Sequence, residues 1–349
     1  MARGGNKPSA ARQKGASTSH KPTERIAKSA DDRNPFLDLH QKCLDIFRDA
    51  LLPSNDDSSI LQEVKGHLYN RDFAAAFGKE EYLRIYASRW SPSRALTYLN
   101  LFIDLTPWIL PAREGDNAAD ESSCMRVLCL GGGAGGELVG LGAWLSVLTG
   151  TSPCAHQQRF HIDLVDMADW TAVIQRLRAG LTHPPELSKY ASQAKKDANK
   201  ALISGSMLDV DFHQLDALSP METKQDSLTS LLEKADLVTF MFTLNELYST
   251  SLSATKTLLN SITSSIRSGS ILLVVDSPGS YSSVSLNGAK KTYPMQWLLD
   301  HTLLGSQGEG TEWKKVTGDD SRWFRLSKEL RYPIPLEDMR FQMHVYRRT

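Results

Sequence analysis

Apolar residues spaced three or four positions apart dominate residues 35–108, and this spacing places them on one face of a helix. Two such series begin the segment and are formed by Phe36, Leu39, Cys43, Phe47 and Leu51, and by Ile60, Val64 and Leu68. We expect a third helix to start at Ser91 as N-cap with Pro92 in its first turn. This helix would turn Leu96, Leu99 and Ile103 inward. The pattern predicts a helical N-terminal cap over residues 35–112.

Beyond a charged linker at residues 111–123, short apolar runs alternate with longer helical stretches. This alternation is typical of a parallel sheet with helices on both faces. The predicted strands cover residues 126–130, 161–165, 212–215, 237–242 and 271–275. Residues 183–202 are polar and rich in lysine, and they predict either an excursion from the sheet or an extended helix.

The C-terminal part departs from this alternation and predicts antiparallel strands at the sheet edge. Runs at residues 313–316 and 323–326 flank a turn-forming segment at residues 318–321, and residues 341–346 predict a last strand. The expected fold is therefore a doubly wound α/β domain over residues 113–349 with a mostly parallel sheet.

Composition narrows the class of protein. A chain of 349 residues with 41% hydrophobic content can bury one large core. Its longest apolar stretch, residues 138–149, contains two glycines and is shorter than the roughly 20 residues that span a bilayer. No secretory signal is evident, so we expect an intracellular protein. The four cysteines lack paired ligand spacing, and no metal is expected.

The net charge is zero, but the first 34 residues are cationic, with eight Lys or Arg against three acids. This tail has too few large apolar residues to offset the entropy of ordering, so disorder is predicted for residues 1–34. Four functions stay open for it: a solvated tail without a specific role, a nuclear or nucleolar address, an RNA-contacting arm, or a mitochondrial transit peptide.

A glycine-rich loop follows the first predicted strand. Glycine permits positive φ and close approach of a ligand to the backbone, and the following helix offers free N–H groups to an anionic part of that ligand. The loop also fits the GxGxxG dinucleotide pattern, so alone it does not separate S-adenosylmethionine from a nicotinamide or flavin nucleotide. A purely structural turn is the third alternative. Its glycines are Gly131, Gly132, Gly133, Gly135 and Gly136.

Acidic residues follow the next two predicted strands. Asp166 can accept hydrogen bonds from ribose hydroxyls, and its distance of 30 residues from Gly136 exceeds the roughly 20 typical of dinucleotide folds. Asp216 is placed to bind the adenine amino group. Together they favour S-adenosylmethionine, although Asp166 could instead cap a helix and Asp216 could lie in a surface turn. Met167, Ala217 and Thr243 complete this predicted cofactor site.

Polar residues also follow the fourth predicted strand. Asn245 and Glu246 would lie next to the sulfonium methyl group, at the substrate-facing edge of the site. Alternatively, either side chain caps the following helix.

Three segments resemble a known family. Residues 89–96 (RWSPSRAL), 130–138 and 243–248 (TLNELY) are similar to those of the fungal 25S ribosomal RNA uridine-N3 methyltransferases, which are nucleolar enzymes of the seven-stranded class I fold. The resemblance covers residues 36–347. The glycine loop is shared by many methyltransferases, whereas the other two segments are more specific.

The resemblance implies a seven-stranded class I fold, S-adenosylmethionine as cofactor, ribosomal RNA or a pre-ribosomal particle as partner, and a location in the nucleolus or nucleus, with the cytoplasm as an alternative. It assigns Gly131, Gly133 and Gly135 to the cofactor loop, Asp166 to the ribose and Asp216 to the adenine. Cys129 stands where many class I enzymes carry an acid, and Glu137 is the expected substitute. A monomer without membrane or metal contacts is expected.

The implied reaction requires an unpaired uracil that loses its N3 proton. Glu246 is the predicted general base, Asn245 would orient the uracil carbonyls, and Tyr248 is an alternative hydrogen-bonding partner. Arginine and aromatic side chains would hold the RNA, unless they serve packing with a snorkelled charge. The predicted RNA-binding residues are Arg84, Arg89, Trp90, Arg94, Arg322 and Trp323.

Three rival functions stay open at this point. They are a nicotinamide-dependent oxidoreductase, a noncatalytic ribosome-assembly factor on a methyltransferase scaffold, and a methyltransferase that acts on protein or a small molecule.

Overall fold

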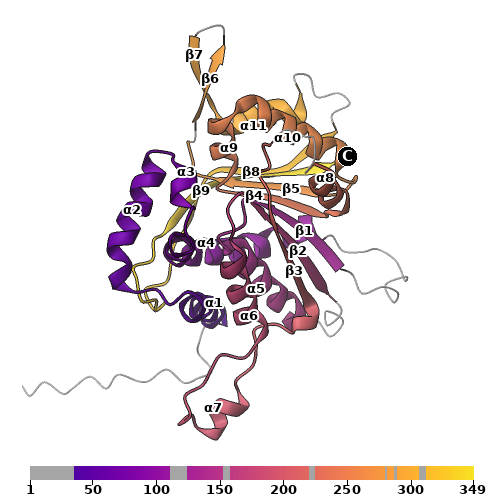
Figure 1. Cartoon of the computed structure of the whole chain (residues 1–349). Coiled ribbons are helices and arrows are strands. Elements are labelled where there is room, and N and C mark those ends of the chain that lie inside the picture. Colours follow the sequence, from indigo (N-terminus) through magenta and orange to yellow (C-terminus); the bar gives the residue numbers. More distant parts are fainter. Residues whose placement is uncertain are drawn as a thin grey trace, which may run out of the picture.

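The computed structural model describes residues 35–110, 124–151, 158–219, 225–279, 281–286, 289–305 and 312–349. Figure 1 shows the course of the chain. The predicted tail and the predicted linker lie outside the described residues.

One sheet of seven strands forms the centre of the described chain, in the order β3-β2-β1-β4-β5-β9-β8. The first five strands along the chain run parallel, β9 is antiparallel to β5, and β8 is antiparallel to β9. The predicted doubly wound, mostly parallel sheet with an antiparallel edge is confirmed. Its strands are β1 (Cys124–Leu130), β2 (Arg159–Asp166), β3 (Leu208–Gln214), β4 (Leu237–Met241), β5 (Ile271–Asp276), β8 (Trp313–Phe324) and β9 (Met339–Arg348).

Helices cover both faces of this sheet (Figure 1). One face packs against α1 (Pro35–Leu51), α4 (Glu80–Ile109), α5 (Gly136–Thr151) and α6 (Thr171–Thr182). The other packs against α8 (Gln225–Lys234), α9 (Leu244–Thr250), α10 (Leu252–Ser265) and α11 (Met295–Leu304). Three further α-helices of the described chain lie outside these layers: α2 (Ser58–Tyr69), α3 (Phe73–Ala76) and α7 (Gln193–Asp197).

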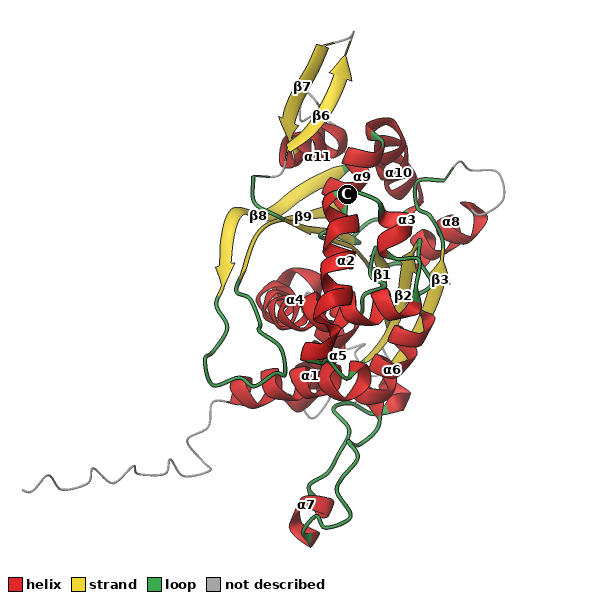
Figure 2. Cartoon of the chain, turned by 60° about the vertical axis from the view of Figure 1, so that its left-hand side comes forward, coloured by secondary structure: helices red, strands yellow, loops and turns green. Residues whose placement is uncertain are grey.

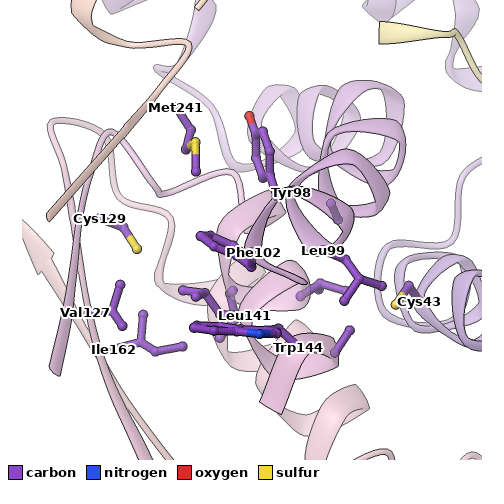
Figure 3. Packing of buried hydrophobic residues seen from close by; sticks show 14 of the residues in the cluster. Cys43, Tyr98, Leu99, Phe102, Val127, Cys129, Leu141, Trp144, Ile162 and Met241 are labelled. Atoms are coloured by element: carbon purple, nitrogen blue, oxygen red, sulfur yellow. The ribbon is translucent and has the colours of Figure 1, made fainter. Parts of the chain in front are cut away.

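Alternating side chains along the strands divide the core into two clusters. Val127 and Cys129 of β1 face α4 and α5, whereas Leu128 and Leu130 face the opposite layer. Figure 3 shows the first cluster, in which the Trp144 ring lies beneath Leu141 and Phe102. The predicted N-terminal helices therefore share one hydrophobic core with the sheet.

The predicted start of the third helix at Ser91 is wrong, because α4 runs unbroken from Glu80 to Ile109 with Pro92 in its interior. A proline within a helix leaves the carbonyl four residues earlier without its N–H donor. Here the carbonyl of Ser88 accepts a hydrogen bond from the Tyr332 hydroxyl at 3.0 Å. The helix continues because a distant part of the chain satisfies the freed carbonyl.

Two further segments differ from expectation, and a third decides between two alternatives. The predicted turn at residues 318–321 lies inside the single strand β8, whose register shifts absorb it as bulges. A hairpin of β6 (Tyr281–Leu286) and β7 (Ala289–Pro294) was not predicted, and it projects from the body in Figures 1 and 2. Residues 183–202 form the predicted excursion with α7 at its tip, so the extended-helix alternative is wrong (Figure 2).

Strand β3 forms one edge of the sheet and begins at Leu208, earlier than predicted. Its Asp211 approaches His161 and Asp163 of β2, and their ligand-type atoms lie within 4.8 Å of one another. His213 bonds Asp163 at 2.8 Å. This edge is therefore strongly polar.

Replacement of Trp144 by alanine should destabilise the fold by about 3–5 kcal/mol, because it removes a fully buried ring. That ring contacts Phe102 and Phe160 at centroid distances of 5.5 and 5.2 Å and donates a hydrogen bond to Thr106. Chemical denaturation would measure the loss. Trp323→Ala is the matched control at a half-exposed ring, where we expect a change below about 1 kcal/mol. Equal losses in both variants would contradict this account of the core.

Candidate active site

A pocket of about 440 Å³ opens at the carboxyl ends of the parallel strands. It lies where the chain order reverses on either side of β1, which is the place at which such sheets bind ligands. Residues that follow β1, β2, β3, β4 and β5 form one wall. An aromatic wall faces it, formed by Phe73 of α3, Phe77 directly after α3, Tyr86 and Trp90 of α4, and Trp170 before α6.

The glycine loop after β1 is shaped by steric necessity. Gly131 has φ +84°, and a Cβ there would lie 2.3 Å from the Thr243 hydroxyl. Gly133 and Gly135 have no room either, because a Cβ would lie 2.0 Å from the Trp170 ring and 2.2 Å from Leu177. Gly131 lines the pocket, whereas Gly132, Gly133 and Gly135 pack beneath it.

Both predicted strand-end acids line the pocket with their neighbours Met167 and Ala217. Asp166 accepts hydrogen bonds from the N–H groups of Gly133 and Ala168, each at 3.2 Å, and burial raises its pKa. Asp216 is exposed and accepts hydrogen bonds from the backbone of Leu218 and the hydroxyl of Ser219. Asp216 thus lies in a surface turn, as one alternative held, and this turn borders the pocket.

Glu137 does not reach the pocket. Its side chain is buried beneath the glycine loop, where the Thr239 hydroxyl donates to its carboxyl. Burial raises the pKa of Glu137 to about 8. Glu137 therefore does not make the expected contact with the ligand. Instead its carboxyl group lies directly under Gly132, where its Oε2 would be 3.0 Å from a Cβ added to that glycine.

The chain turns sharply after β4. Phe242 has φ +63°, which is rare for a bulky residue and often marks a functional site. Thr243 is the N-cap of α9, so the alternative in which Asn245 or Glu246 caps this helix is wrong. Both residues line the pocket. Within the described structure, Asn245 Oδ1 and Glu246 Oε2 are buried without hydrogen-bond partners, so both atoms can accept a hydrogen bond from a molecule bound in the pocket.

Tyr248 lies away from the pocket, contrary to prediction. One turn after Leu244 on the same face of α9, it is 2% exposed and packs in the core between the sheet and helices α10 and α11. Burial raises its pKa. Tyr248 therefore has a packing role in the core.

Sequence reasoning missed Asp276, the last residue of β5. Its side chain is 3% exposed and lines the pocket, where it accepts hydrogen bonds from the N–H groups of Asn245 at 3.0 Å and Ser277 at 2.7 Å. Burial raises the pKa of Asp276 to about 6. The rule that identified Asp166, an acid at a strand end, would have found it.

Of the six predicted RNA-binding residues, Trp90 and Arg94 line the pocket. The Arg94 guanidinium donates to the Tyr86 hydroxyl and lies 5.0 Å from the centre of the Phe242 ring. The structure gives Arg84 a structural role instead, because the Asp57 carboxylate and the Leu51 carbonyl occupy its guanidinium.

The other three predicted RNA-binding residues lie outside the pocket lining. Arg89 pairs with Glu337 and Arg322 with Asp104. Trp323 is half-exposed, with the guanidinium of Arg325 4.0 Å from its ring centre.

Residues 46–347 match the model of a family described as SAM-dependent methyltransferases. The chain belongs to this family. It is 32% identical over 333 residues to the 25S rRNA (uridine(2843)-N(3))-methyltransferase of Saccharomyces cerevisiae, covering 88% of this chain and 85% of that protein. The oxidoreductase alternative is therefore wrong.

Solved structures show weaker similarity to this methyltransferase. A SAM-dependent methyltransferase of Methanosarcina mazei is 9% identical with a TM-score of 0.34, over 64% of this chain and 92% of that one. Another from Clostridium acetobutylicum is 8% identical with a TM-score of 0.31, over 71% and 98%. The described helices of our chain include none with the length and apolarity to cross a membrane.

The charges of the pocket suit S-adenosylmethionine. Four carboxyl groups line it, and Arg94 is the one Lys or Arg among its described lining residues. A sulfonium cation is favoured in such surroundings, whereas the pyrophosphate of a dinucleotide is not. The carboxyl groups belong to Asp166, Asp216, Glu246 and Asp276. Asp166 and Asp216 would hold the adenosine, and the backbone of the Gly131 loop would hold the amino-acid part.

Gly131→Ala should weaken the binding of S-adenosylhomocysteine by about tenfold or more, roughly 1.4 kcal/mol, because the added Cβ displaces Thr243 at the pocket wall. Gly269→Ala is a matched control, since Gly269 has φ +88° and nothing within 4 Å of the added Cβ. Both variants share the backbone strain, but the control should retain affinity. Titration calorimetry would measure both, and equal affinities would contradict the proposed contact.

Glu137→Gln should stabilise the methyltransferase at neutral and alkaline pH. Since the folded pKa of about 8 exceeds the unfolded value near 4.5, the wild type loses stability as pH rises between them. The variant lacks this loss, so its advantage should grow by about 1 kcal/mol per pH unit in that range. Denaturation at several pH values would measure it. The exposed Glu233→Gln should follow the wild type, and an advantage independent of pH would contradict a buried neutral carboxyl.

Proposed function

We propose that this methyltransferase transfers a methyl group to N3 of a uridine in large-subunit ribosomal RNA. The observation that carries the proposal is the 32% identity to the yeast uridine-N3 enzyme over most of both chains. The pocket supports it with buried polar groups suited to a planar imide and with an aromatic wall.

When bound, S-adenosylmethionine supplies an electrophilic methyl group and leaves as S-adenosylhomocysteine. The protein has to align the acceptor and remove its proton. Uracil N3 carries a proton and is paired within duplexes, so the base must enter the pocket unpaired or flipped out.

The aromatic wall offers faces on which an unpaired base can stack. Tyr86 is its centre, with ring-centroid distances of 4.7 Å to Trp90, 5.2 Å to Phe77 and 5.8 Å to Trp170. Stacking on such rings contributes about 1–3 kcal/mol per base without depending on its identity. Identity must then be read by polar groups.

Asn245 and Glu246 provide those groups. The side chain of Asn245 carries both an amide donor and the unpartnered Oδ1, so it can orient the uracil carbonyl and imide groups. The unpartnered Oε2 of Glu246 can accept a hydrogen bond from the base or take up its proton.

The same proposal places the protein in the nucleolus or nucleus on a pre-ribosomal particle, as a monomer. Trp323 with Arg325 and Arg340 forms an exposed ring-and-guanidinium surface that suits RNA contact outside the pocket. The basic residues of the first 34 positions would add sequence-independent attraction for phosphates.

Deletion of the gene from the source organism should remove one 3-methyluridine from large-subunit ribosomal RNA, as measured by nucleoside mass spectrometry. The wild-type gene should restore it, and Gly269→Ala should do so as well, whereas Gly131→Ala should restore it poorly. An unchanged content of 3-methyluridine in the deletion strain would refute the RNA substrate. It would favour a protein or small-molecule acceptor, or a noncatalytic assembly role.

A further inference from the structure

A buried carboxylate at the end of β5 has hydrogen-bond acceptor positions that the fold does not use. Asp276 is almost fully shielded from bulk water, yet it lines the pocket. Each of its two oxygens accepts one backbone N–H, from Asn245 and from Ser277. A carboxylate offers about four lone-pair positions, so each oxygen retains one. Since Asp276 lines the pocket, a molecule bound there can reach these positions.

The strand order places Asp276 on the acceptor side of the site. The acids proposed for the adenosine follow β2 and β3, and the strands continue in the order β1, β4 and β5. A ligand with its adenosine over β2 and β3 must extend past β1 toward β4. Asp276, on β5, then lies beyond the reactive end of that ligand, where the acceptor base enters.

The charged and titratable groups around Asp276 come from two helices. Arg94 and Tyr98 belong to α4, and Glu246 belongs to the first turn of α9. Burial raises the pKa of Asp276 and the negative charge of Glu246 adds to this effect, whereas the two backbone N–H donors and the charge of Arg94 lower the pKa. With a pKa of about 6, the Asp276 carboxyl group is ionised at neutral pH, yet it is basic enough to accept a proton during the reaction.

We propose that Asp276 is the catalytic base that accepts the N3 proton of the uracil. This inference rests on the proposed function. The two backbone N–H donors fix the carboxylate in place, whereas Glu246 Oε2 is unpartnered and is left to position the base together with Asn245.

The N3–H bond breaks, and its proton forms an O–H bond with a carboxylate oxygen of Asp276. The electron pair left on N3 forms the bond to the methyl carbon, while sulfur takes the pair of the broken C–S bond. After the product leaves, Asp276 returns the proton to water.

Asp276→Asn tests the proposal in the full-length protein on ribosomal RNA isolated from cells that lack the gene. Turnover to 3-methyluridine at saturating S-adenosylmethionine should fall by about 10²- to 10⁴-fold. Calorimetric affinity for S-adenosylhomocysteine should stay within about threefold of the wild type, because the adenosine contacts are untouched. Asp236→Asn is the matched control, since Asp236 also accepts a backbone N–H, from Arg126, but lies at the opposite ends of the strands.

The pH profile adds a test that a structural role would not pass. Wild-type turnover should rise with pH through about 6 and then level off as Asp276 ionises, whereas the variant should continue to gain rate at alkaline pH as the uracil loses its own proton to solvent. Asp276→Ala should regain part of its turnover on addition of formate, which can occupy the vacated space. A cooperative thermal unfolding transition in both variants would show that the loss of turnover does not come from unfolding.

Three results would overturn the proposal. Turnover of Asp276→Asn within tenfold of the wild type would show that another group takes the proton. A large loss of S-adenosylhomocysteine affinity with turnover retained would make Asp276 a cofactor ligand. If the wild-type protein forms no 3-methyluridine, the proposed function itself is refuted. This failure differs from the other two because it is seen without the variant.

Discussion

The close contact between α4 and α5 at Gly140 determines how the rest of the site is assembled. A Cβ at Gly140 would lie 3.2 Å from the carbonyl oxygen of Ala95 and 3.4 Å from the backbone nitrogen of Leu99, so the two helices touch through their backbones. The Ser91 hydroxyl donates to the Ala134 carbonyl of the glycine loop one turn away. Because α4 is held this closely, its N-terminal half extends over the strand ends and brings Tyr86, Trp90 and Arg94 to the pocket.

Burial of acids is the second organising feature. Glu137, Asp166 and Asp276 all lie near the glycine loop or in the pocket, and burial raises the pKa of each. A concentration of carboxyl groups with little access to water disfavours full ionisation in the empty protein. Binding of a positively charged ligand relieves part of this cost, so the same arrangement that is unfavourable in isolation contributes to ligand selectivity.

The sequence predicted those parts of the fold that depend on local periodicity and strand ends. The parallel strands, the glycine loop and the placement of Asp166 and Asp216 at the pocket followed from short-range patterns. The continuous helix through Pro92 did not, because Tyr332, some 240 residues away, satisfies its free carbonyl. Tyr248 and Glu137 were misplaced because each lies in the first two turns of a helix close to a strand end. Closeness in sequence to the strand end does not reveal whether a helical side chain faces the pocket or the core. Asp276 required no long-range information, only the same strand-end rule applied once more.

The two outer strands of the sheet bear on how copies of this protein behave in a crowded solution. An outer strand exposes unpaired backbone groups that can pair with another chain. Along β3 these groups are interspersed with Asp209, Asp211 and His213, and along β8 the bulged segment carries Asp319 and Asp320. Pairing of two β3 edges would bring these carboxylates together, and the bulges of β8 interrupt a regular edge, so both borders of the described sheet disfavour fibrillar association.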